Sequence, residues 1–152
     1  MGGDIIELAV AIELECAALY EVFARSFASN PEIVYFWKLY AEAERYHGAS
    51  IRIHQAAFAA ELAPDQLAVG AEDAAAVLAE IREMRQRFER TPPGIREALA
   101  VARRVEESSA ELHGRTQFFK LPALQELFHK MAEEDRDHRD VLAKAEQRFA
   151  GA

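Results

Sequence analysis

Residues 41–47 read AEAERYH, and this stretch decides how the rest of the chain is interpreted. Glu44 and His47 stand three residues apart in a segment whose other inward positions are apolar. Residues at i and i+3 of a helix project from one face, so the pair can bind one metal ion. Residues 132–138, AEEDRDH, repeat the arrangement. Two such pairs predict a carboxylate-bridged centre of two metals inside a four-helix bundle.

Four long segments carry the same helical pattern, and each has an acid where an apolar residue is expected. Within each segment the inward positions recur in alternating steps of three and four residues, which is typical of packed helices. Uninterrupted packing would favour leucines at all of these positions. The acids in the four seams, with the two histidines one turn on, are Glu13, Glu44, His47, Glu106, Asp135 and His138.

The order of these segments predicts an all-α fold in which residues 1–152 form a single domain. Helices are expected at about 4–27, 31–63, 94–117 and 122–149, with Asn30 or Ser29 capping the second. A crossover at about 64–93 separates the second and third of them. Its centre should be an amphipathic helix at 73–90 with an apolar stripe of Val77, Ile81, Met84 and Phe88.

The four acids should also meet at one depth. Antiparallel helices joined by a short loop bring together residues that lie equally far from that loop. Each seam acid lies about 14 to 17 residues from its own hairpin loop, which at ~1.5 Å per residue places all four within about one turn. The crossover is long enough to run the length of the bundle and make the second and third long helices parallel. This is an up-down four-helix bundle with a long helical crossover.

Composition and charge exclude several classes of protein. The chain has 152 residues and a formal net charge of −8, which argues against nucleic acid and an anionic membrane surface as partners. Cys16 is the single cysteine, so no intramolecular disulfide or CxxC motif exists. No apolar run reaches the length of a membrane span, and the first residues lack a basic signal-peptide region. A cytoplasmic protein is therefore expected.

Buried acids require compensation. Each uncompensated carboxylate in a core would cost several kcal/mol. Two divalent cations supply four positive charges, which balance four carboxylates and leave neutral imidazoles to complete the coordination. Oxygen and imidazole ligands without a thiolate suit iron or manganese, and zinc is a common substitute.

These pieces resemble the rubrerythrin-like branch of the ferritin-like di-iron proteins. The matching features are Glu13 followed by Tyr20, the Glu44/His47 pair, Glu106, and the Asp135/His138 pair, and they span almost the whole chain. The resemblance implies a ferritin-like bundle holding two iron ions, bridged by the second-helix glutamate and its fourth-helix counterpart. It implies an oxidoreductase that reduces hydrogen peroxide or dioxygen, or one that oxidises and handles ferrous iron.

The sequence departs from that family in three ways. Asp135 stands where the family usually has glutamate, and Ser109 stands where rubrerythrins add a second carboxylate. The rubredoxin module with paired CxxC motifs is missing, so the resemblance implies an external electron donor such as a rubredoxin-like protein. Glu134, at i+4 spacing from His138, is the alternative ligand to Asp135.

Other assignments stay open at this stage. Tyr20 is either an outer-shell group that bonds a ligand carboxylate or quenches a radical, or a core tyrosine. His113 and His54 also lie on seams, where packing is favoured over a second-shell or ligand role. The functional alternatives are iron storage and a metal-free helical interaction module. Apolar residues on the outer side of the second helix suggest a homodimer surface or a seat for the crossover helix: Val34, Phe36 and Leu39.

Overall fold

The computed structural model describes residues 2–60, 71–116 and 121–150, with side chains from residue 5 onward. Within those ranges the chain forms five helices and no strand, so the prediction of an all-α fold is confirmed. The helices are α1 (Gly2–Ser26), α2 (Pro31–Ala57), α3 (Ala71–Arg90), α4 (Ile95–Arg115) and α5 (Pro122–Arg148).

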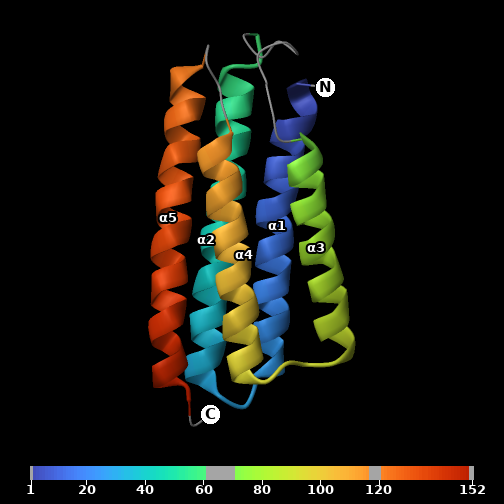
Figure 1. The fold of residues 1–152 in the computed structure, drawn as a ribbon, viewed down its shortest axis with the longest axis vertical. Helices are drawn as coiled ribbons and strands as arrows, with labels where there is room; N and C mark the ends of the chain where they lie inside the picture. The colour runs from blue at the N-terminus through green and yellow to red at the C-terminus, as the bar shows by residue number, and fades with distance from the viewer. Residues whose placement is uncertain (1, 61–70, 117–120, 151–152) are drawn as a thin grey trace.

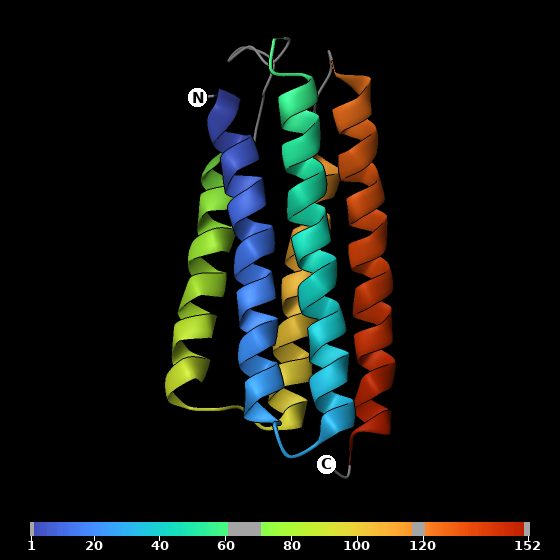
Figure 2. The same ribbon diagram turned by 180° about the vertical axis from the view of Figure 1, so that it is seen from behind.

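The five helices lie side by side and alternate in direction along the chain (Figures 1 and 2). The closest packing is of α1 on α2 and of α4 on α5, and these two antiparallel pairs meet through α2 with α5 and α1 with α4. The crossover helix α3 packs along α1 and returns the chain to the end where α2 began. Helices α2 and α4 are therefore parallel, as the length of the crossover predicts.

Helix α2 starts where the sequence predicts. The side-chain oxygen of Asn30 accepts hydrogen bonds from the backbone nitrogens of Glu32 (3.2 Å) and Ile33 (3.3 Å). This N-cap, followed by Pro31, satisfies backbone donors that have no partner inside the helix. The expected end near residue 63 is wrong, because the helix stops at Ala57. No glycine or proline marks this earlier end in the sequence. Helix α1 begins at Gly2, before the expected start at residue 4. The expected gap between the third and fourth long helices, at 118–121, lies largely outside the described residues.

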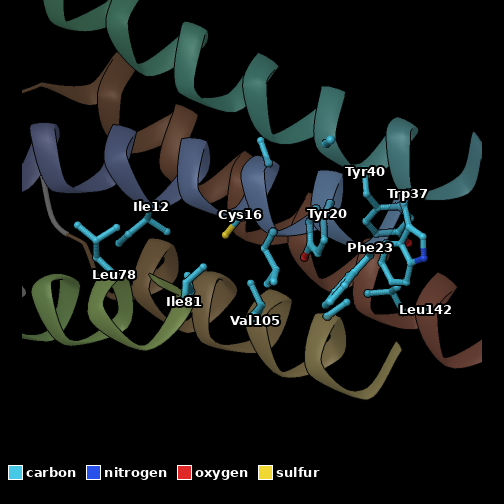
Figure 3. Packing of buried hydrophobic residues seen from close by; sticks show 14 of the residues in the cluster. Ile12, Cys16, Tyr20, Phe23, Trp37, Tyr40, Leu78, Ile81, Val105 and Leu142 are labelled. Atoms are coloured by element: carbon cyan, nitrogen blue, oxygen red, sulfur yellow. The ribbon is translucent and has the colours of Figure 1, made fainter. Parts of the chain in front are cut away.

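An aromatic cluster fills the core between α1 and α2 on one side of the buried acids. Tyr20 stacks on Trp37 with ring centroids 5.7 Å apart, and Phe23 meets the same indole edge-on at 4.9 Å. Figure 3 shows these rings gathered with Tyr40, while Cys16 and Ile12 continue the core along α1. Rigid aromatic packing of this kind fixes the position of the Tyr20 hydroxyl, which points towards the acids.

The crossover helix α3 packs against the core with the apolar stripe that the sequence predicts. Ile81 and Phe88 are buried, and Val77 and Met84 are partly buried against the core. However, α3 packs on α1 and makes no contact with α2, so the predicted seat on the outer side of α2 is wrong. Leu39 on that side remains 52% exposed. The homodimer stays a prediction.

Candidate metal centre

The first group of donor atoms comes from α1 and α2. Glu13, Glu44 and His47 each offer one ligand atom, and the three atoms lie within 4.8 Å of one another. His47 Nδ1 is 3.3 Å from Glu13 Oε2 and 3.5 Å from Glu44 Oε2. All three side chains are almost completely buried. This group could hold a metal ion in the interior of the bundle.

The second group combines α2, α4 and α5. Glu44, Glu106, Asp135 and His138 offer four ligand atoms within 4.8 Å of one another. His138 Nδ1 lies 3.5 Å from Glu106 Oε2 and 4.0 Å from Glu44 Oε1. Glu44 belongs to both groups and turns one carboxylate oxygen to the histidine of each. The two candidate positions are therefore adjacent, with Glu44 between them.

The distances within the groups are those expected between ligands of one cation. Two atoms bound about 2.1 Å from one ion lie roughly 3.0 to 3.4 Å apart at tetrahedral or octahedral angles, and at most about 4.2 Å. The distances from His47 and His138 to the acids, 3.3 to 4.0 Å, fall within these limits. By contrast, Tyr20 donates a hydrogen bond of 2.6 Å to Glu106 Oε1 at the edge of the centre.

Several polar atoms of the centre have no hydrogen-bond partner. Buried polar atoms are normally paired, and an unpaired one costs about 1–3 kcal/mol. Among the described buried side chains, six such atoms occur, and only the Trp37 indole nitrogen lies outside this cluster. The others are Glu13 Oε1, Glu44 Oε1, His113 Nε2, Asp135 Oδ1 and His138 Nδ1. Oxygen and imidazole donors left in this state fit a hard or borderline divalent ion.

Sulfur does not join the donor set. Cys16 is buried one turn from Glu13, where burial and the charges of Glu44 and Glu13 raise the pKa of its thiol. Cys16 is also absent from both groups of gathered ligand atoms. The candidate donors are therefore carboxylates and imidazoles.

The two histidines differ in what supports them. His47 is 3% exposed, and its Nε2 lies 2.7 Å from Glu134 Oε2, so its ring is held between the centre and an outer carboxylate. A carboxylate on the far nitrogen orients an imidazole ligand and increases its basicity. The side chain of His138 is 26% exposed, and the ring faces that of His47 at 6.2 Å. Solvent thus approaches the centre beside His138.

A third histidine, His113, is part of the cluster. It is fully buried, with Nδ1 2.7 Å from Asp135 Oδ2 and Nε2 3.0 Å from Glu13 Oε1. The second contact is an ion-pair distance without hydrogen-bond alignment. Sequence reasoning favoured a core histidine here, although its place seven residues after Glu106 was the signal for an inward role.

Burial and neighbouring charges shift the pKa values of three of the acids in different directions. Burial raises the pKa of Glu44, and the neighbouring charge of Glu106 raises it further. Burial acts the same way on Glu13, but the nearby charge of His113 and the hydrogen bond of His47 outweigh it and hold that pKa below its usual range. Burial raises the pKa of Asp135 to about 6 although the His113 hydrogen bond lowers it. The surroundings thus favour the protonated form of Glu44 and the charged form of Glu13.

The imidazoles respond in the opposite sense. Burial disfavours their charged forms, yet the surrounding acids prevail and raise the pKa of His47 to about 12 and that of His113 to about 10. Hydrogen bonding to Glu106 raises the pKa of His138 in the same way. Protons on these rings and cations in the donor groups are thus alternative ways to neutralise the same carboxylates.

The structure brings the six predicted ligand residues to one place. On α5 it turns Asp135 inward, at 1% exposure, while Glu134 lies at the edge against His47. His54 is not part of the cluster, because its Nδ1 contacts the Ser50 carbonyl at 2.8 Å. Ser109 is buried near the second group without supplying a carboxylate.

Comparison with protein-family models, with curated proteins and with solved structures finds no match to the chain. No described helix is both long and apolar enough to cross a membrane. The functional argument therefore depends on the cluster itself.

Proposed function

We propose that this chain is a redox protein similar to the rubrerythrins and other ferritin-like proteins. It would bind two divalent metal ions, preferably iron, and react with hydrogen peroxide or dioxygen. The observation that carries the proposal is the pair of overlapping buried donor groups that share Glu44. A single structural cation would need only one group. Two adjacent positions with a common carboxylate are typical of two-metal centres, which in helix bundles include the di-iron and di-manganese carboxylate proteins.

The donor set fits the iron chemistry implied by the sequence. Two ferrous ions in these positions would supply the two electrons that, with two protons, convert hydrogen peroxide into two water molecules. Glu44 would bind both ions, and His47 and His138 would each bind one. Tyr20 would hold Glu106 through its 2.6 Å hydrogen bond without binding an ion itself.

The residues around the centre, and the single cysteine, also indicate where the oxidant would enter and where electrons would come from. Helix α3 packs along α1, the helix that carries Glu13, and the Tyr40 ring lies 5.1 Å from the His138 ring. A small oxidant would enter beside His138, whose side chain is 26% exposed. With Cys16 as its single cysteine, the chain carries no rubredoxin-type iron site. The electrons would come from an external donor or from further ferrous iron.

Anaerobic ferrous titration of the chelator-treated protein tests the proposal, with elemental analysis after desalting. We expect close to two irons per chain, and a reduced number in Glu106→Ala. Glu107→Ala is the matched control, since Glu107 is the adjacent but exposed acid on α4. Loaded protein should then consume about one peroxide per two ferrous ions oxidised.

Two outcomes would reject this function. Failure to retain iron, manganese or zinc would favour a metal-free interaction module. Uptake of many irons per chain into a large mineral-filled particle on size-exclusion chromatography would favour storage.

A further inference from the structure

We infer that His113 is a positioning residue for the centre, which fixes Asp135 so that this short carboxylate reaches the second ion. The inference rests on the proposed metal binding but concerns a residue outside both donor groups. His113 lies on α4, whereas the two acids that it contacts come from α1 and α5.

The two oxygens of Asp135 face in different directions. Oδ2 accepts the 2.7 Å hydrogen bond from His113 Nδ1, while Oδ1 has no hydrogen-bond partner among the described residues and lies 4.0 Å from His47 Nδ1. One oxygen is therefore held from outside, and the other is left for the donor group. Outer hydrogen bonds of this kind orient ligand carboxylates and increase metal affinity.

Glu13 shows the same division. Its Oε2 faces His47 at 3.3 Å, and its Oε1 faces His113 Nε2 at 3.0 Å. His113 thus lies behind a carboxylate of each donor group. Its ring is wedged edge-on against Phe128, with centroids 5.5 Å apart and planes at 80°. This packing limits rotation of the ring, so the direction of Nδ1 is set before any ligand binds.

A direct ligand role is the less suitable interpretation. His113 is not among the residues whose donor atoms gather within 4.8 Å in either group. Its 2.7 Å distance to Asp135 is that of a charge-assisted hydrogen bond, shorter than the separation of two ligands on one ion. An aspartate has one methylene fewer than a glutamate, so fixing its orientation matters more for its reach.

Two substitutions separate positioning from simple packing. His113→Leu keeps the approximate volume but removes both ring nitrogens. In His113→Asn, the side-chain amide can present an N–H near the place of Nδ1 and so keep the bond to Asp135. In calorimetric titrations with zinc or cobalt, we expect His113→Leu to lower the affinity for the second ion by ~10- to 100-fold. The His113→Asn variant should keep most of the wild-type affinity for the second ion. The affinity for the first ion should change less in both variants.

The hydrogen bond is also measurable without metal. In the chelator-treated chain, nitrogen-15 NMR should show a slowly exchanging proton on His113 Nδ1 that is lost in Asp135→Ala. Wild-type protein that binds two ions, with equal second-ion affinity in His113→Leu, would overturn the positioning role and leave the proposed function intact. A rapidly exchanging Nδ1 proton would overturn it as well. Wild-type protein that binds no ion would instead reject the function, and the positioning role with it.

Discussion

The α1/α2 pair and the α4/α5 pair contribute to the same centre but protect it unequally. Glu13, Glu44 and His47 of the first pair are at most 4% exposed at their side chains, and Glu134 holds the outer nitrogen of the histidine. In the second pair, His138 is 26% exposed and its Nδ1 has no hydrogen-bond partner among the described residues.

The position of α3 contributes to this difference on the α1 side. It packs along α1 and makes only a smaller contact with α4, so α1 is covered from outside, whereas neither α2 nor α5 contacts α3. The comparison indicates a division of labour within one cluster. In the proposed two-ion centre, the first position would retain its ion, and the second would exchange its ion and meet small molecules.

Loss of the shared carboxylate should remove both metal positions, and with them the difference between the two helix pairs. We expect Glu44→Gln to lose both ions, because this residue belongs to both donor groups. The chelator-treated variant should melt at or above the temperature of chelator-treated wild type, since a neutral amide replaces a carboxyl group whose charged form is disfavoured by burial and by Glu106. Elemental analysis and thermal melting measure the two effects. Glu42→Gln, exposed on the same helix, is the control and should change neither. Retention of one tightly bound ion would contradict the shared role.

Removal of one histidine at a time should expose the asymmetry. His47→Ala leaves three buried acids and the outer Glu134 without their imidazole, so we expect the larger fall in metal affinity, more than tenfold. His138→Ala opens a position that solvent already reaches, and we expect a smaller fall confined to the second ion. Zinc titration monitored by calorimetry would measure both. A larger loss in His138→Ala would reverse the proposed order of the two positions.

The pH dependence of stability should differ between the chelator-treated and loaded forms. A raised imidazole pKa contributes stability that is fully present below the unfolded value near 6.5 and is lost as pH rises through the folded value. With the pKa of His113 at about 10 and that of His47 at about 12, the chelator-treated protein should lose stability steadily above pH 6.5.

The raised pKa of Asp135 acts in the same direction at lower pH, between about 4 and 6. Bound cations replace these protons, so loaded protein should keep its melting temperature from pH 6.5 to 9 and release protons on loading. Melting curves across this range, with and without chelator, measure the divergence. Parallel declines would show that protons and metal do not compete at this cluster.

The smallest effect on metal binding is expected when the hydrogen bond that joins the two helix pairs, from Tyr20 to Glu106, is removed. Tyr20→Phe removes the hydrogen bond from α1 to Glu106 on α4 but keeps the stack on Trp37. We expect both ions to remain, with a loss of about 1.5–3 kcal/mol in the stability of the chelator-treated protein. Denaturant unfolding measures that loss, and Tyr46→Phe, at an exposed tyrosine, is the control. Loss of an ion would make Tyr20 more than an outer contact.

Helical periodicity was sufficient to predict which residues would face one another. The step pattern placed Glu13, Glu44, Glu106 and Asp135 inward, and distance from the hairpin loops placed them at one level. On the fourth long helix the seam favoured Asp135 but left Glu134 as an alternative, and the structure buries Asp135. These properties depend on the repeat of a helix and on chain length, which the sequence contains directly.

The sequence could not predict which residues contact the candidate ligands from behind. The positions of His113 between two acids and of Glu134 against His47 depend on how far each side chain reaches across helices. Such pairs come from different helices and leave no spacing signal in the sequence. The seat of α3 on α1 was equally hidden, because both α1 and α2 offered apolar surface and only the packed arrangement distinguishes them.

The burial of α1 has a kinetic consequence. This helix contacts α2, α3 and α4 and carries a long row of fully buried residues, so its amides should exchange with deuterium only on global unfolding. Helix α5 has fewer neighbours and should open locally and more often. Metal would then enter and leave as α5 moves away from a framework that stays folded. The rate of metal release would follow local opening of α5 and be independent of the overall stability of the chain.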